Sequence, residues 1–273
     1  MSRISQCFEN LKADGQTALI PYVTAGDPEP WVTVPLLHAL VDAGADIIEL
    51  GIPFSDPMCD GPVIQKACER ALKNDVSIKH VLKMVKQFRE KNKETPIVLM
   101  GYANPIEAIG YQNFAEQAKA AGVDGVLTVD VPPEESDEFR QIMDEHGIDT
   151  IYLVAPTTSP ERMETIASYA RGFIYYVSIK GVTGAAALQV DEVTEKLSQL
   201  REKTSLPLGV GFGIRDGKSA AAVAGVADAV VVGSTLVRCI EEHADRMDEL
   251  PAAVAGLLAE MRHAINARDL ASA

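Results

Sequence analysis

The chain has 273 residues, enough for two small domains or for one large α/β barrel. Its hydrophobic content of 47% and its charged content of 23% are those of a soluble globular protein with a sizeable core. The formal net charge of −14 argues against a surface for nucleic acid or for anionic membranes. It does not exclude a phosphorylated small substrate, because backbone N–H groups at helix N-termini bind phosphate with little help from lysine.

The chain also lacks the sequence marks of a secreted or membrane protein. No apolar segment approaches the roughly 18 residues that a membrane span requires, and the N-terminus has no apolar signal core. The four cysteines contain no CxxC pair, which excludes a zinc knuckle or a redox motif of that type. We therefore expect a cytoplasmic protein with reduced thiols.

Apolar runs and helical patterns alternate along the whole chain. The apolar runs predict strands at 18–24, 47–50, 96–102, 125–130, 149–155, 172–178, 206–212 and 227–233. Helical spacing and capping residues predict helices at 2–13, 31–43, 63–72, 78–89, 114–121, 133–146, from 159 onward, 190–202, 218–224, near Leu236 and at 251–267.

Eight strands separated by helices predict a parallel sheet, and eight such units in about 250 residues are the size of a closed (β/α)8 barrel. An open doubly wound sheet is the alternative. We favour a single (β/α)8 TIM barrel domain over residues 1–273, with an extra N-terminal helix and additional short helices, because no linker interrupts the series.

One segment combines a buried strand with an acidic loop. Glu49 stands among Ile47, Ile48 and Leu50, where an isolated carboxylate is costly unless it is paired, neutral or used for chemistry. Asp60 follows in a loop that Pro53, Pro57 and Pro62 restrict. The two carboxyl groups predict an acid/base site, and the alternatives are a structural ion pair for Glu49 and a loop cap for Asp60.

Active sites of such barrels lie at the C-terminal ends of the strands. The polar groups expected there are Thr24, Asp27, Glu49, Asp56, Asp60, Tyr102, Asn104, Asp130, Tyr175, Ser178, Lys180, Thr183 and Ser234. All five histidines fall instead in predicted helices or at helix ends, so we expect no catalytic metal.

Glycines mark the ends of three predicted strands, at 181–184, 211–214 and 233–234. The loops after strands seven and eight are the usual phosphate site of this fold, which makes a phosphate site there the favoured interpretation. Apolar or aromatic residues are expected at neighbouring strand ends, namely Tyr22, Met100, Leu127 and Phe212. They are either ordinary barrel core or a flat pocket for an aromatic ring.

Four motifs together resemble one family. Glu-Leu-Gly-Ile-Pro-Phe-Ser-Asp-Pro at 49–57 with Asp-Gly-Pro at 60–62, Pro-Tyr-Val-Thr-Ala-Gly-Asp-Pro at 21–28, Gly-Val-Thr-Gly at 181–184 and Gly-Phe-Gly-Ile at 211–214 resemble the tryptophan synthase alpha chains. The resemblance runs from end to end. It implies a lyase that splits indole-3-glycerol phosphate into indole and glyceraldehyde 3-phosphate.

The resemblance also implies roles for single residues. Glu49 is the acid/base that protonates the ring carbon, and Asp60 accepts the hydrogen bond of the indole N–H. Tyr175 lines the site near Glu49, and Thr183 lies in a loop that closes over it. Phosphate binding falls to Gly184, Gly213, Gly233 and Ser234, and the indole pocket to Tyr22, Met100, Leu127 and Phe212.

A partner is implied in the same way: a pyridoxal-phosphate-dependent beta chain, in an alpha2-beta2 heterotetramer, with no cofactor in the present chain. The contact surface would include Asp56, Pro57, Asn104 and Pro105. Three other hypotheses stay open. The chain is a lyase that works alone, or it mainly activates the beta chain, or it is a Schiff-base aldolase that uses Lys180.

Overall fold

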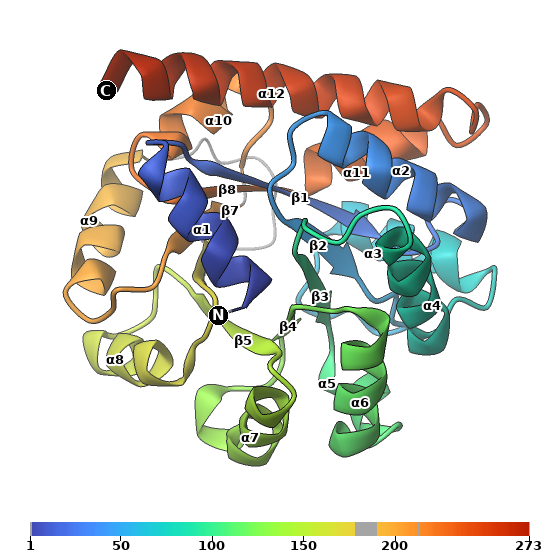
Figure 1. Cartoon of the computed structure of the whole chain (residues 1–273), viewed down its shortest axis with the longest axis horizontal. Coiled ribbons are helices and arrows are strands. Elements are labelled where there is room, and N and C mark those ends of the chain that lie inside the picture. Colours follow the sequence, from blue (N-terminus) through green and yellow to red (C-terminus); the bar gives the residue numbers. More distant parts are fainter. Residues whose placement is uncertain (1, 178–189, 212, 273) are drawn as a thin grey trace.

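The strands form a closed barrel, as the computed structural model of the chain shows (Figure 1). The structure describes residues 2–177, 190–211 and 213–272. In these ranges the strands are β1 Ala18–Thr24, β2 Ile48–Gly51, β3 Ile97–Gly101, β4 Gly125–Thr128, β5 Asp149–Val154, β6 Ile174–Val177, β7 Leu208–Gly211 and β8 Ala229–Val232. Each strand pairs in parallel with the next, and β8 pairs with β1. The predicted (β/α)8 barrel is confirmed, and the doubly wound sheet is excluded.

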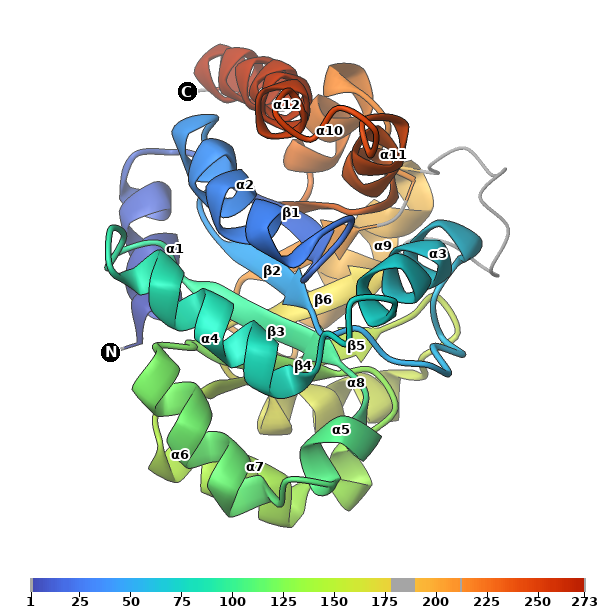
Figure 2. The ribbon, with the colours of Figure 1, turned by 90° about the vertical axis from the view of Figure 1, so that its right-hand side faces the viewer.

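Helices surround the barrel (Figures 1 and 2). They are α1 Arg3–Ala13, α2 Pro30–Asp42, α3 Pro62–Leu72, α4 Ile78–Arg89, α5 Ala103–Glu107, α6 Tyr111–Ala121, the 3₁₀ helix η1 Pro133–Glu135, α7 Asp137–Glu145, α8 Pro160–Tyr169, α9 Val190–Arg201, α10 Gly217–Ala224, α11 Ser234–Glu242 and α12 Leu250–Ser272. Every predicted helix is present, and α5 is an additional one.

The predicted helix at 133–146 is wrong in one detail, because Ser136 interrupts it. The Ser136 N–H and Oγ both donate to the Pro133 carbonyl, at 3.1 Å and 2.8 Å. Its Oγ also lies 2.6 Å from the Tyr152 hydroxyl. A side chain that bonds to nearby backbone competes with the α-helical pattern, so a 3₁₀ turn precedes α7.

The N-terminal helix closes one end of the barrel. Ile4 and Phe8 of α1 are buried in the same apolar cluster as the residues inside the barrel. The Phe8 ring lies 5.8 Å from that of Phe173, which precedes β6. The Ser2 hydroxyl, which caps α1, donates to Asp149 at the start of β5. These contacts occupy the N-terminal ends of the strands, and the C-terminal ends carry the polar loops.

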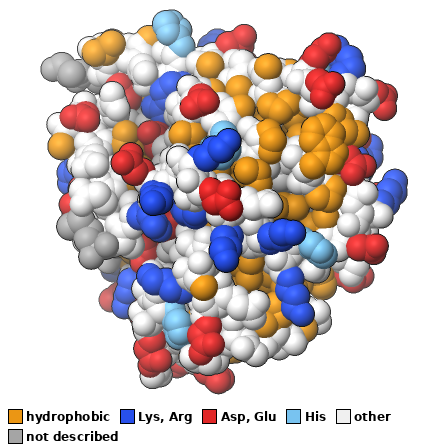
Figure 3. All heavy atoms as spheres, turned by 45° about the vertical axis from the view of Figure 1, so that its right-hand side comes forward, with side chains coloured by type: hydrophobic (Ala, Val, Ile, Leu, Met, Phe, Trp, Pro, Cys, Tyr) orange, Lys and Arg blue, Asp and Glu red, His pale blue; other side chains and the backbone are white. Residues whose placement is uncertain are grey.

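Two features of the outer surface bear on binding to a membrane or to a nucleic acid. Among the helices in the described ranges, none is both long and apolar enough to cross a bilayer. On the face shown in Figure 3, Lys and Arg side chains are interspersed with Asp and Glu. That face therefore presents no continuous basic area of the kind that binds a phosphate backbone.

Candidate active site

Glu49 lies inside the barrel because of the alternation along β2. Its neighbours Ile48 and Leu50 pack outward in the large apolar cluster between barrel and helices, so the side chain of Glu49 points inward. Its Cα is in register with Tyr22 of β1 and Val98 of β3. Only 2% of the residue is exposed. The unusual charge in the apolar run is therefore a fully enclosed carboxyl group.

The surroundings of Glu49 favour its neutral form. Its Oε1 is buried and has no hydrogen-bond partner among the described residues. Burial, and secondarily the charge of Asp60, raises the pKa of Glu49 from 4.5 to about 8. A carboxylic acid with such a pKa holds its proton at neutral pH and can both give and take one near it.

Asp60 lies at the end of the loop that joins β2 to α3, close enough to Glu49 for its charge to affect that group. It is buried, and the Tyr102 hydroxyl donates to its Oδ2 at 3.0 Å. Its backbone is fixed as well, since its N–H donates to the Pro57 carbonyl and its own carbonyl accepts from Gln65 Nε2. Burial raises the pKa of Asp60 to about 6, although the bond from Tyr102 acts in the opposite direction. Between pH 6 and pH 8, Asp60 is therefore mostly ionised and Glu49 mostly neutral.

Two buried tyrosines extend over glycines of the following strands. A Cβ on Gly51 would collide with the Tyr22 hydroxyl, and one on Gly211 would collide with the Tyr175 hydroxyl. Burial raises the pKa of both phenols, and Glu49 and Asp60 raise each of them further. The tyrosines therefore lie close enough to sense both carboxyl groups, and only glycine leaves room for them.

Of the expected apolar pocket residues, Tyr22 and Leu127 are buried and Met100 is partly buried. Tyr22 belongs to a cluster with Cys68 of α3 and Val237 of α11, and Met100 packs against that cluster and against the barrel interior. Leu127 is in register with Met100 on the neighbouring strand. The fourth expected residue, Phe212, lies outside the described residues.

The loops after β7 and β8 meet at the N-terminus of α11. Gly233 caps this helix and Ser234 begins it. The first helical bonds run from Leu236 and Val237 to the Gly233 carbonyl, so the N–H groups of Ser234 and Thr235 have no acceptor within the helix. Thr235 Oγ1 donates to the Ile214 carbonyl at 2.7 Å and joins the two loops.

Gly213, in the first of these loops, has a positive φ of 79°, a conformation that favours glycine. The arrangement suits an anion. Gly184, Thr183 and Lys180 lie outside the described residues.

The loop that carries Asp60 also reaches the outer surface. Asp56 is exposed there and Pro57 half-buried, and on α5 Asn104 is exposed and Pro105 half-buried. Met58, which is 78% exposed on this loop, had no predicted role. Tyr102 was expected only as one of the polar groups at the strand ends, and it reaches Asp60 across the fold. An unbranched apolar residue beside an acidic loop was a usable signal for Met58, whereas a tyrosine at a strand end usually indicates core.

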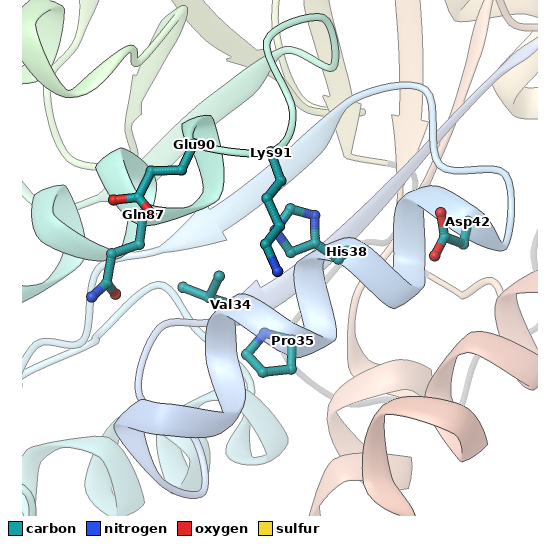
Figure 4. Close-up of a pocket in the computed structure, with 7 residues that line it drawn as sticks. All are labelled: Val34, Pro35, His38, Asp42, Gln87, Glu90 and Lys91. Carbon is teal, nitrogen blue, oxygen red and sulfur yellow. The ribbon is translucent and has the colours of Figure 1, made fainter.

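A separate hollow of about 620 Å³ lies between α2 and the end of α4 (Figure 4). It is lined by Val34, Pro35, His38, Asp42, Gln87, Glu90 and Lys91. No strand residue lines it, and His38 stacks on the Phe88 ring at 4.7 Å. Within the described ranges, no group of three or more His, Cys, Asp or Glu residues is arranged to hold a metal ion. The strand ends therefore remain the candidate active site.

Known proteins share this arrangement. The family model described as "Tryptophan synthase alpha chain" matches residues 8–266. The tryptophan synthase alpha chain of Nitrosococcus oceani is 58% identical over 98% of this chain and 99% of its own length. That of Thioalkalivibrio sulfidiphilus is 62% identical over 97% of this chain and its entire length.

Solved structures agree with the sequences. The crystal structure of tryptophan synthase subunit alpha from Legionella pneumophila has a TM-score of 0.91 and 48% identity, covering 98% of this chain and 99% of that one. A chain in a tryptophan synthase complex from Pyrococcus furiosus has a TM-score of 0.81 and 39% identity, covering 90% of this chain and 98% of that one. The chain therefore belongs to the tryptophan synthase alpha chain family, lyases that cleave indole-3-glycerol phosphate and pass the indole to a beta chain for tryptophan synthesis.

Proposed function

We propose that Glu49 is the proton donor and acceptor of the cleavage and that Asp60 stabilises the charge that develops on the indole ring. The observation that carries this proposal is the buried Oε1 of Glu49, which has no hydrogen-bond partner among the described residues, in a group with a pKa of about 8 beside an ionised Asp60. Burying a polar oxygen without a hydrogen bond costs free energy, and such groups are typical of active sites.

The proposed reaction begins with neutral Glu49. It gives its proton to the ring carbon that bears the glycerol chain, and the ring becomes a cation. The resulting carboxylate then takes the proton of the hydroxyl group next to the ring. The carbon that bears this hydroxyl becomes the aldehyde carbon of glyceraldehyde 3-phosphate. Its bond to the ring breaks, and the electron pair of that bond returns to the ring. Glu49 ends the cycle protonated, so one residue performs both transfers.

The other residues are proposed to bind the substrate around this step. Asp60 accepts the indole N–H, where a fixed anion opposes the positive charge of the ring. Tyr175 lies against the reacting end, and Tyr22, Met100, Leu127 and Phe212 enclose the ring. The phosphate is assigned to Gly213, Gly233 and Ser234 at the N-terminus of α11, together with Gly184. Thr183 is assigned to closure over the bound substrate.

The test is indole release from indole-3-glycerol phosphate by the wild-type chain and Glu49→Gln, each with beta chain. Glu69→Gln on α3 is the matched control, because it removes an exposed glutamate of the same size. We expect a loss of about 10²- to 10⁴-fold for Glu49→Gln and none for the control. Equal rates in all three proteins would end the proposal for Glu49.

We also propose how the chain assembles: one domain over residues 1–273, without a cofactor of its own, in a cytoplasmic alpha2-beta2 heterotetramer. The pyridoxal phosphate would belong to the beta chain. The proposed contact surface is Asp56 and Pro57 with Asn104 and Pro105. Met58, which follows Pro57 and is exposed, supports this, since large exposed apolar side chains favour association.

Light scattering of a mixture with beta chain tests the assembly. The expected particle has the mass of two chains of each kind. Asp56→Lys is expected to weaken the complex, whereas Asp14→Lys, an exposed position after α1 at the opposite end of the barrel, is not. Identical affinities for the two variants would remove Asp56 from the proposed surface.

A further inference from the structure

Tyr102 connects Asp60 to the barrel by several contacts. Its hydroxyl donates to Asp60 Oδ2 at 3.0 Å and accepts the N–H of Cys59 at 3.0 Å. Its ring stacks on Phe54 at 5.2 Å, at the beginning of the same loop. One buried side chain thus holds both ends of the loop that carries Asp60.

We propose that Tyr102 is a positioning residue for the cleavage reaction: it ties one oxygen of the Asp60 carboxylate and leaves the other for the indole N–H. The proposal rests on the role of Asp60 put forward above. A carboxylate that already accepts one directed hydrogen bond has a fixed plane, so its second oxygen has a fixed direction. Among the described residues, no donor contacts Asp60 Oδ1.

Tyr102 is itself firmly anchored. It directly follows β3 and is the N-cap of α5, and it is 4% exposed. The next residue, Ala103, donates its N–H to Asp130 Oδ1 at 2.9 Å. The phenol therefore has a rigid base on the barrel, which a group that directs another side chain requires.

The charges around Asp60 make this hydroxyl important. Six titratable groups face Asp60 from the described elements. They are Tyr22 of β1, Glu49 of β2, Cys68 of α3, Tyr102 after β3, Tyr175 of β6, and Cys59, which precedes Asp60 in its own loop. None of these six groups is a cation. The Tyr102 bond lowers the pKa of Asp60 against the effect of burial, so the same hydroxyl that orients the carboxylate also favours its ionised form.

The test compares Tyr102→Phe with Tyr111→Phe. Phenylalanine keeps the ring that stacks on Phe54 and removes only the hydroxyl. Tyr111 is a matched control, because its hydroxyl also donates to a carboxylate, Glu107 Oε1 at 2.8 Å, but at the surface of α6. We expect kcat/KM of Tyr102→Phe to fall about 10- to 100-fold at pH 7, the loss of one charge-assisted bond.

The pH profile separates positioning from a general loss of structure. Without the hydroxyl, burial acts on Asp60 unopposed, so its pKa rises and the acid limb of kcat/KM moves to higher pH. The deficit of Tyr102→Phe should therefore be largest at acid pH and should shrink as the pH is raised toward 8, down to the part that comes from the lost orientation of Asp60. A merely destabilised protein would show no shift of the acid limb, and an unshifted limb would overturn the inference.

A double variant distinguishes the role of Tyr102 from the role of Asp60. If Asp60→Asn is impaired, adding Tyr102→Phe should cost little more, because the bond has lost its charged partner. Should Asp60→Asn retain wild-type activity, the role of Asp60 itself fails. Should Asp60→Asn be impaired while Tyr102→Phe matches Tyr111→Phe in rate and pH profile, only the role of Tyr102 fails.

Discussion

Glu49→Gln is expected to make the protein more stable, increasingly so as the pH rises. The folded wild type keeps this buried group neutral up to a pKa of about 8, whereas its ordinary pKa is 4.5. Above pH 4.5, folding therefore requires the uptake of a proton. The contribution of Glu49 to stability is fully present below pH 4.5 and is lost progressively until the pH passes 8. Glutamine has the same shape and no such proton.

The size of the effect follows from the two pKa values. Each pH unit between them removes about 1.4 kcal/mol from the wild type relative to the variant. Between pH 5 and pH 7.5 the difference in unfolding free energy should grow by about 3 kcal/mol. Any constant cost of burying the amide cancels, because only the change with pH is compared.

Urea unfolding of the two proteins at several pH values from 5 to 8.5 measures this difference. Glu69→Gln is again the control, since it makes the same substitution on the exposed face of α3. A stability difference for Glu49→Gln that stays constant across this range would refute the account of Glu49 as a buried neutral acid. A site kept at the expense of stability is expected where catalysis needs it.

Three further results are expected. The pH profile of kcat/KM for indole-3-glycerol phosphate should be bell-shaped, because Asp60 must be ionised and Glu49 protonated. Its two apparent pKa values should be about 6 and about 8. A flat profile from pH 5.5 to 9 would contradict this assignment. Asp27→Asn should lower the free energy of unfolding, measured in urea, by about 3 kcal/mol, because Arg70 loses the buried carboxylate that it binds through two nitrogens. An unchanged stability would show that Glu241, 3.3 Å from Arg70, is enough to balance the charge of Arg70. Gly51→Ala should lower activity and reduce the free energy of unfolding by about 1 to 3 kcal/mol, because the added Cβ collides with the Tyr22 side chain. Adding Tyr22→Leu should restore part of that stability. If it does not, the clash with Tyr22 is not the cause of the loss.

Most of the barrel could be predicted from the alternation of apolar runs and helical patterns. Parallel strands buried on both faces are nearly continuous apolar runs, and Ala18–Thr24 was predicted to the residue. Helix α5 was missed because Ala103–Glu107 has only five residues, too few for a helical period. The interruption at Ser136 comes with the bonds of its N–H and Oγ to the Pro133 carbonyl, and the Tyr152 hydroxyl, distant in sequence, lies against the same Oγ; the helical pattern of 133–146 shows neither contact.

The candidate site was predictable where a residue contradicted its surroundings. Glu49 could be identified because a carboxyl group in an apolar strand has a cost. Tyr102 could not be assigned a role, since a tyrosine at a strand end is compatible with ordinary core. Its contact with Asp60 arises only when β2 and β3 lie side by side and the intervening loop folds back. The sequence also gives no sign that a Cβ at Gly51 would collide with Tyr22, because the two residues come together only in the barrel.

Glu49 is proposed to transfer protons rather than to hold the site together. Substrate affinity and single-turnover cleavage by Glu49→Gln, measured separately with beta chain present, distinguish the two roles. We expect the variant to bind indole-3-glycerol phosphate nearly as well as the wild type and to cleave it about 10²- to 10⁴-fold more slowly. Weak binding with an undiminished rate of cleavage for the bound substrate would show that Glu49 holds the site together instead.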